Sequence, residues 1–170
     1  MDHRIPLLVL LAGAMGCAAI APPEPIAPLP SIELSTLDNR AADLRAIIDG
    51  RVAVVNLWAS WCEACEGEWP ALNRLAANVE KGDAVVVGVA VGEARATVNA
   101  FLERHPSSYV QLVDEDFRFA DFVAKRRVPT TLVIDRRGRV VYAGGAMDSL
   151  VLAAFRRASS EPRDAPVPTR

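Results

Sequence analysis

The sequence is organised around residues 54–65, which read VVNLWASWCEAC. An apolar run ends there at Cys62 and Cys65, two cysteines with two residues between them. A short apolar run of this kind is typical of a buried β-strand, and the residues after Cys62 have the pattern of a helix. The segment therefore predicts a core strand that carries a Cys-x-x-Cys pair to the start of a helix.

The position of this cysteine pair favours redox chemistry. The first turn of a helix has unpaired backbone N–H groups and the positive end of the helix dipole, and both stabilise a thiolate. We therefore expect Cys62 to be the acidic, exposed sulfur that attacks a substrate disulfide. Cys65, one turn later on the same face, is close enough to form a disulfide with Cys62 and so release the reduced substrate. The same steps in reverse would oxidise a dithiol.

Two sequence blocks, in this order, resemble the thioredoxin superfamily, and within it the extracytoplasmic, membrane-anchored TlpA/ResA branch of thiol-disulfide oxidoreductases. The first block is NLWASWCEACEGEWP at 56–70; the second is VPTTLVID at 128–135, followed by RGRVVY at 137–142. The resemblance extends over residues 31–157. It implies a thioredoxin-like α/β fold, with a central mixed sheet flanked by helices, an N-terminal β-hairpin and an inserted βα unit.

The resemblance also implies two further catalytic residues. Pro129 matches the proline that is cis in this superfamily and faces the cysteine pair, where it would present the backbone of Val128 to a substrate strand. Glu68 matches a glutamate typical of the branch. Because burial near thiolates would raise the pKa of this carboxyl, we expect Glu68 to accept the proton of Cys65. The alternative for Glu68 is a solvated glutamate on the helix surface.

Substrate contacts are expected from the residues beside these groups. Trp61, Glu63 and Ala64 flank Cys62, and Thr130 follows the proline. The negative charge of Glu63 opposes a thiolate, which would raise the pKa of Cys62 and favour a reductant over an oxidant. Ala64 stands where the branch usually has proline, a change that alters the redox potential and the choice of partner.

The rest of the domain is expected to alternate strands and helices. Asn56 is an uncharged amide where many cytoplasmic thioredoxins have a buried Asp. Another group must therefore accept and return the protons of the cysteine thiols. His105 is expected to be a surface histidine. The patterns predict strands at 31–37, 52–58, 84–91, 109–113, 131–134 and 139–142, and helices at 42–48, 63–79, 97–104, 116–125 and 148–157.

The two ends of the chain predict segments outside the domain. Residues 1–16 contain an apolar run too short to span a bilayer comfortably, which predicts an export signal. Small residues directly before Cys17 resemble a bacterial lipobox, so we expect Cys17 to be the lipidated N-terminus, with simple cleavage or a retained anchor as alternatives. Proline-rich residues 17–30 predict a tether, and 159–170 predict a disordered tail. The thioredoxin-like domain is therefore expected at 31–158.

Composition agrees with this division. The chain has 170 residues, 51% hydrophobic content and a formal charge of −2, which fits one domain plus appendages and gives no basic excess for binding nucleic acid. Its three cysteines provide one for lipid and two for redox chemistry. A single Cys-x-x-Cys in an exported protein does not fit a disulfide-stapled scaffold.

These features predict an enzyme, a thiol-disulfide oxidoreductase of the bacterial cell envelope. It would face the periplasm, held to the inner or the outer membrane by the lipid at Cys17. We expect it to reduce protein disulfides, for instance in cytochrome c maturation as the branch implies, with electrons from a membrane thiol donor. We expect a monomer, with no cofactor, no metal and no nucleic-acid partner.

Two other functions are left open by the residues. One is a dithiol oxidase or isomerase, which uses the same cysteines in the opposite direction. The other is a copper-binding envelope lipoprotein that uses the two thiols as soft ligands. Copper carriers of this superfamily space their cysteines by three residues and add a distant histidine, a pattern that this sequence lacks.

Overall fold

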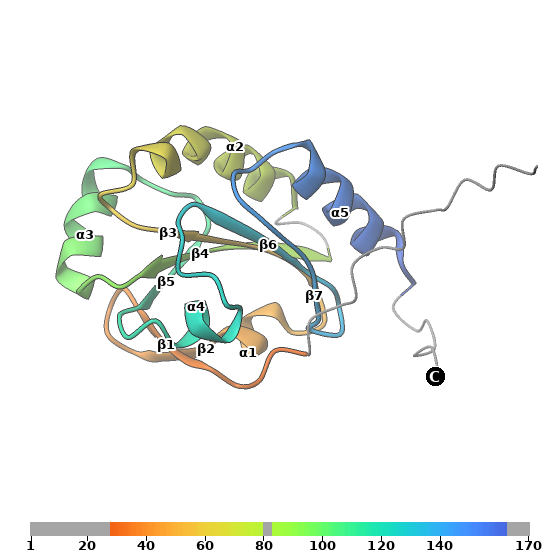
Figure 1. The fold of residues 1–170 in the computed structure, drawn as a ribbon, viewed down its shortest axis with the longest axis horizontal. Coiled ribbons are helices and arrows are strands. Elements are labelled where there is room, and N and C mark those ends of the chain that lie inside the picture. Colours follow the sequence, from red (N-terminus) through yellow and green to blue (C-terminus); the bar gives the residue numbers. More distant parts are fainter. Residues whose placement is uncertain (1–27, 80–82, 163–170) are drawn as a thin grey trace, which may run out of the picture.

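A computed structural model describes residues 28–79 and 83–162 (Figure 1). Seven strands form one mixed sheet in the order β2-β1-β5-β4-β3-β6-β7. The strands are β1 (Glu33–Thr36), β2 (Ala41–Asp43), β3 (Val52–Trp58), β4 (Ala84–Val91), β5 (Val110–Asp114), β6 (Thr130–Ile134) and β7 (Val140–Gly144). The helices are α1 (Leu44–Ile48), α2 (Glu63–Val79), α3 (Arg95–Arg104), α4 (Arg118–Phe122) and α5 (Ser149–Ser160).

The strand β3 lies inside the sheet and is buried at every position. It pairs in parallel with β4 and antiparallel with β6. The apolar run of β4 is parallel to both of its neighbours, the arrangement in which helices cover both faces of a sheet. The β1–β2 hairpin and the α3–β5 unit extend this core. The predicted fold class is therefore confirmed.

Helices α2 and α5 cover one face of the sheet, and α1 and α4 cover the other (Figure 1). Alternate residues of β3 point to opposite faces of the sheet, as in any pleated strand. Val52 and Val54 pack in the cluster that includes Leu72 of α2, whereas Val55 and Leu57 pack in the opposite cluster. This packing fixes β3 from both sides and so positions the loop that follows it.

Leu29 corrects the predicted boundary between tether and domain. Its side chain is 2% exposed and belongs to the core. Its N–H donates to the carbonyl of Gly138 at 2.8 Å, and Pro28 pairs with Arg139 in an isolated bridge. Burial of a leucine stabilises a fold by about 1.5–3 kcal/mol, so this contact is part of the domain. Residues 1–27, which include the predicted signal and Cys17, lie outside the described residues.

The end of the domain also differs from the prediction, because α5 continues to Ser160, past the expected boundary at 158. The guanidinium of Arg136 donates to the carbonyls of Ala158, Ser159 and Glu161. These bonds supply partners for backbone carbonyls at the end of the helix. The remainder of the predicted tail, from residue 163 onward, lies outside the described residues.

Two short helices are smaller than predicted. Phe117 and Ala124 adopt left-handed backbone conformations on either side of α4, which confines that helix to five residues. The helix predicted at 42–48 begins only at Leu44, because Ala41–Asp43 pairs with β1 as a strand. The side chain of Asp43 then caps α1 by accepting from the N–H of Arg45.

Candidate active site

Cys62 and Cys65 meet where β3 gives way to α2. They form a disulfide with an S–S length of 2.06 Å and a Cα–Cα distance of 5.3 Å. The backbone N–H of Cys65 donates to Sγ of Cys62 at 3.2 Å. This is the contact predicted for a sulfur at a helix N-terminus, and it would favour a thiolate on Cys62 once the disulfide is opened.

The prediction that Cys62 is exposed is wrong for this oxidised form. Cys62 is 6% exposed and Cys65 is 2% exposed. Both pack in a cluster with the aromatic side chains of Trp58 and Trp69. The rings of these two tryptophans meet edge to face at 4.9 Å. Only a small part of Cys62 is therefore accessible to solvent, and its neighbours in the cluster are apolar.

Glu68 is buried, with 7% exposure, so the solvated alternative does not apply. Its carboxylate accepts from the backbone N–H of Met147 at 2.8 Å and from Nδ2 of Asn56 at 3.1 Å. Burial raises the pKa of Glu68, these two hydrogen bonds partly oppose the rise, and the charge of Asp148 adds to it. A carboxyl in this state holds its proton at a higher pH than an exposed glutamate does.

Asn56 is a functional candidate that sequence analysis missed. Its Nδ2 bridges Glu68 and the hydroxyl of Thr131, each at 3.1 Å. Its Oδ1 is buried and has no hydrogen-bond partner among the residues that the structure describes. The available signal was an amide in the middle of a buried strand, since buried polar groups need partners. Asn56 holds one side of the Glu68 carboxylate in place.

Glu93 is a second residue that the sequence did not reveal. It lies in the loop between β4 and α3, and its carboxylate accepts from both the N–H of Ser60 at 2.6 Å and the hydroxyl of Ser60 at 2.5 Å. These two bonds fix the backbone two residues before Cys62. No local pattern predicts a contact across 33 residues of sequence.

The segment before β6 forms the other side of the site. The peptide bond between Val128 and Pro129 is cis, as the resemblance implies. Val128 packs against the cluster that contains both cysteines. The hydroxyl of Thr130 donates to the carbonyl of Arg127 at 2.6 Å, and the residue is buried. The Thr130 hydroxyl is therefore engaged within the protein, while the residue also lines a groove next to Pro129.

The surface beside Cys62 is formed by the start of α2. Trp61 is 71% exposed, more than any other large hydrophobic residue among the described residues. Glu63, Ala64 and Glu66 are exposed as well. Neither glutamate forms an ion pair within the described residues, so both negative charges face solvent next to Cys62.

A sequence model of the Redoxin family matches residues 26–149. The chain belongs to the Redoxin family. This Redoxin-family chain is 27% identical over 120 residues to the thiol-disulfide oxidoreductase ResA of Halalkalibacterium halodurans, covering 69% of this chain and 68% of the relative. It is 33% identical over 112 residues to the thiol:disulfide interchange protein DsbE of Pseudomonas fluorescens biotype C, covering 65% and 61%.

A solved structure supports the fold of this Redoxin-family chain. The thioredoxin domain of a thiol-disulfide oxidoreductase from Bacteroides vulgatus matches with a TM-score of 0.69 at 17% identity, covering 79% of this chain and 98% of that domain. The chain spans 60% to 68% of the length of the ResA relatives from Halalkalibacterium and Geobacillus. The ResA and DsbE relatives are named as a thiol-disulfide oxidoreductase and a thiol:disulfide interchange protein, and this chain has a Cys62–Cys65 disulfide. Both observations favour disulfide exchange over the copper-carrier alternative.

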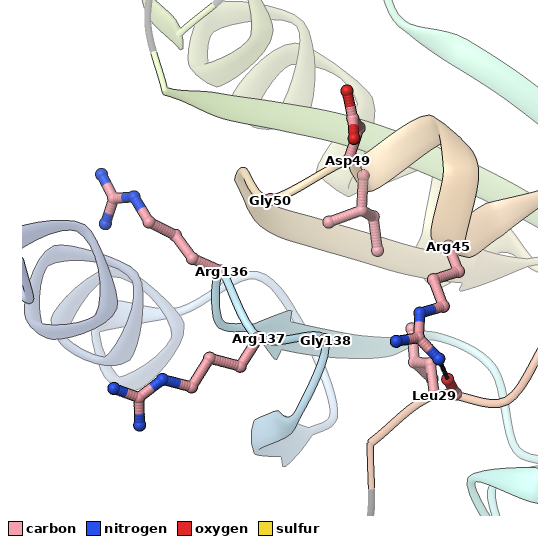
Figure 2. Close-up of a pocket in the computed structure, with 8 residues that line it drawn as sticks. Leu29, Arg45, Asp49, Gly50, Arg136, Arg137 and Gly138 are labelled. Carbon is pink, nitrogen blue, oxygen red and sulfur yellow. Dashed lines mark hydrogen bonds between the residues drawn. The ribbon is translucent and has the colours of Figure 1, made fainter. Parts of the chain in front are cut away.

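A separate cavity of about 260 Å³ is lined by residues of α1, of the turn before β3 and of the β6–β7 turn (Figure 2). Gly50 precedes β3, whereas the cysteines follow it, so the cavity is distant from the disulfide. Figure 2 shows the guanidinium groups of Arg45, Arg136 and Arg137 pointing in different directions. Arg45 donates to the carbonyl of Leu29 at 3.3 Å, and Arg136 binds the end of α5. These side chains do not converge on one point. This cavity is therefore a weaker candidate for the active site than the region around the disulfide.

Two further observations concern the described ranges 28–79 and 83–162. Within them, no group of three or more His, Cys, Asp or Glu residues is arranged to hold a metal ion. None of the helices found there is long and apolar enough to cross a bilayer. His105, predicted at the surface, is half-buried and stacks on Phe101 with ring centroids 4.3 Å apart.

Proposed function

We propose that this protein is an extracytoplasmic oxidoreductase that reduces protein disulfides through Cys62 and Cys65. The observation that carries the proposal is the N–H of Cys65 directed at Sγ of Cys62 at the start of α2. This geometry supports Cys62 as the nucleophile, because a hydrogen bond to sulfur stabilises its thiolate form. The packing of Val128 against the same cluster supports the segment at Pro129 as the place where a substrate strand pairs.

The reaction begins with the Cys62–Cys65 pair reduced. The Cys62 thiolate attacks one sulfur of the substrate disulfide, forms a mixed disulfide and releases the other substrate sulfur as a thiolate. Cys65 then gives up its proton and attacks Sγ of Cys62, which releases the second substrate sulfur and leaves the Cys62–Cys65 disulfide. Two electrons pass to the substrate in one cycle, and a dithiol donor must return them.

Glu68 is the proposed acceptor of the Cys65 proton. It lies one helical turn after Cys65, and its raised pKa brings it closer to that of a thiol than an exposed carboxyl would be. Asn56 and the N–H of Met147 hold its two oxygens and so act as positioning groups. Glu68 in its ionised form can take the proton as Cys65 attacks.

The charges beside Cys62 favour reduction over oxidation of substrates. Glu63 and Glu66 occupy the first turn of α2, where acidic groups oppose a thiolate on the neighbouring sulfur. A less stabilised thiolate makes the dithiol a stronger reductant. This supports a reductant, for example of apocytochrome c cysteines, over a dithiol oxidase or isomerase.

The proposed location is the bacterial envelope, on the periplasmic side. A lipid on Cys17 would anchor the chain, and the proline-rich residues after it would hold the domain away from the membrane surface. A membrane thiol donor would then supply electrons to a protein that acts as a monomer.

A single-turnover reaction tests the proposed activity. The protein is reduced, freed of reductant and mixed with excess peptide disulfide, and the thiols formed on the peptide are counted by alkylation. We expect one peptide disulfide to be reduced per protein molecule while Cys62 and Cys65 become oxidised. A reduced protein that leaves the peptide disulfide intact would contradict the proposal.

A further inference from the structure

A groove of about 390 Å³ is lined by Pro129, the residue after Val128, which packs against the cluster that contains both cysteines. One of its walls is the loop before β6, which contributes Lys125, Arg126 and Arg127. The opposite wall is the end of β7 and the residue after it, Gly144 and Gly145. None of the described residues that line the groove is acidic. The groove thus continues from the proposed strand-pairing position into a basic environment.

The three basic residues of this loop are not equivalent. Arg126 forms an ion pair with Asp121 and lies over the ring of Phe117 at 4.9 Å, so its charge is already neutralised. The side chains of Lys125 and Arg127 make no ion pair or hydrogen bond within the described part of the chain. Two cationic groups therefore remain available to a ligand in the groove.

The two glycines of the groove differ in the space beside them. A Cβ on Gly144 would lie 2.2 Å from the hydroxyl of Tyr142, so the tyrosine side chain already covers that position. A Cβ on Gly145 would meet nothing within 4 Å. The carbonyl of Gly145 accepts from the N–H of Thr131, which ties this residue to β6. An extended chain can therefore approach the backbone closely at Gly145.

The start of α2, directly after Cys62, has the opposite charge to the groove. Glu63 and Glu66 are exposed in the first turn of α2 and have no ion-pair partner among the described residues. The site is thus electrically polar, with negative charge at the start of α2 and positive charge at the groove. A substrate segment that pairs with the backbone at Val128 runs in one fixed direction, so its two flanks meet opposite charges.

We propose that this groove binds an acidic segment of the substrate protein, and that Lys125 and Arg127 make the enzyme select disulfides with acidic residues on one flank and basic or neutral residues on the other. The inference rests on the proposed function, since it concerns how the same disulfide chooses its substrate. The ligand class is an extended polypeptide with carboxylate side chains. Lys125 and Arg127 determine specificity and do not take part in the covalent steps.

Two peptides of one composition test this polarity. Each contains the same disulfide loop; one has Asp residues before the loop and Lys residues after it, and the other has the reverse order. We expect reduced protein to reduce one of them roughly threefold to tenfold faster at low salt, the effect of two exposed charge pairs. The difference should disappear near 1 M salt, where the screening length is about 3 Å.

A double variant locates the source of the preference. In Lys125→Gln/Arg127→Gln the ratio of the two rates should fall toward one, with only the contribution of Glu63 and Glu66 remaining. The matched control is Arg156→Gln/Arg157→Gln, which removes the same charge from exposed positions of α5 and should retain the wild-type ratio. Should the double variant fail to fold, the single variant Arg127→Gln, at an exposed position, should still lower the ratio.

The outcomes separate this inference from the proposed function. Equal rates for the two peptides at low salt would overturn the inference while leaving disulfide reduction intact. A rate ratio in the groove variant as large as that of the wild type would overturn it as well. If neither peptide is reduced by wild-type protein, the proposed function itself fails.

Discussion

The two sides of the redox disulfide are built in different ways. In α2, Glu68 is buried and is held by Asn56 and by the N–H of Met147, while Glu63 and Glu66 at the start of the helix are exposed. On the opposite side, Lys125 and Arg127 reach the surface of a groove and make no side-chain bonds within the described residues. In the proposed mechanism the buried network serves proton transfer, whereas the unpaired charges of the groove select the substrate.

The largest effect should come from the cysteines themselves. In Cys65→Ser, the Cys62 thiolate still attacks a substrate disulfide but no second sulfur resolves the product, so a mixed disulfide should accumulate. Turnover should fall by roughly a thousandfold or more. Mass spectrometry would detect the adduct, and Cys62→Ser, as the control, should give none. An adduct in Cys62→Ser would reverse the assignment of the two sulfurs.

Loss of the buried base should have the next largest effect. Glu68→Gln removes the proton acceptor, and we expect resolution of the mixed disulfide to slow by roughly tenfold to a hundredfold. Because burial raises the pKa of Glu68, the wild-type rate should also fall as pH decreases through that raised value, when the protonated carboxyl can no longer accept a proton. The variant should lack this fall in stopped-flow measurements.

Glu66→Gln is the matched control for that experiment, because Glu66 lies in the same helix but is exposed. In Glu66→Gln the rate should still decrease at low pH, as it does in the wild type. Wild-type turnover and an unchanged pH profile in Glu68→Gln would remove Glu68 from the mechanism.

The network around Glu68 can also be broken through its partner. Asn56→Asp places a second carboxyl against Glu68, and two adjacent carboxyls resist joint ionisation. The folded pair then keeps a proton that the unfolded chain loses, so folded-state stability should decrease as pH rises above the ordinary range of carboxyl pKa values. We expect the free energy of unfolding to be about 1–3 kcal/mol below that of the wild type at mildly alkaline pH.

Denaturant unfolding at several pH values would measure this effect. Asn78→Asp, an exposed change of the same type in α2, is the control and should show little pH-dependent loss. An Asn56→Asp protein as stable as the wild type at alkaline pH would show that the amide and the carboxyl are not coupled as described.

The smallest effect should come from the exposed acids. Glu63→Gln/Glu66→Gln removes two negative charges near Cys62, so the pKa of the Cys62 thiol should fall by a few tenths of a unit, as is typical of exposed charges. The pH dependence of alkylation of the reduced protein would measure it. A thiol pKa that stays constant or rises would remove these glutamates from the control of Cys62.

The predictable part of this molecule is the part that is local in sequence. The apolar run of β3 and the spacing of Cys62 and Cys65 predict strand, helix and redox pair, because each depends on residues within a few positions of one another. The same helix places Glu68 one turn after Cys65, although the burial that raises its pKa depends on tertiary packing. The cis peptide bond before Pro129 was predicted from the resemblance of residues 128–135 to the thioredoxin superfamily.

What could not be predicted depends on long-range contacts. Asn56 meets Thr131 across 75 positions, and Glu93 meets Ser60 across 33. Leu29 stands in a proline-rich stretch whose composition predicts a tether, yet its side chain fills the core. The groove joins a loop before β6 to the end of β7. Neither periodicity nor composition reports which distant segments become neighbours.

The reduction potential of the Cys62–Cys65 couple tests the central claim most directly. The protein is equilibrated in glutathione or dithiothreitol redox buffers, and the fraction reduced is determined by alkylation and mass spectrometry. If the protein is a disulfide reductant, its potential should lie near that of thioredoxin, roughly −270 mV. A potential near roughly −120 mV, typical of a strong oxidant, would contradict this account and make the protein a dithiol oxidase.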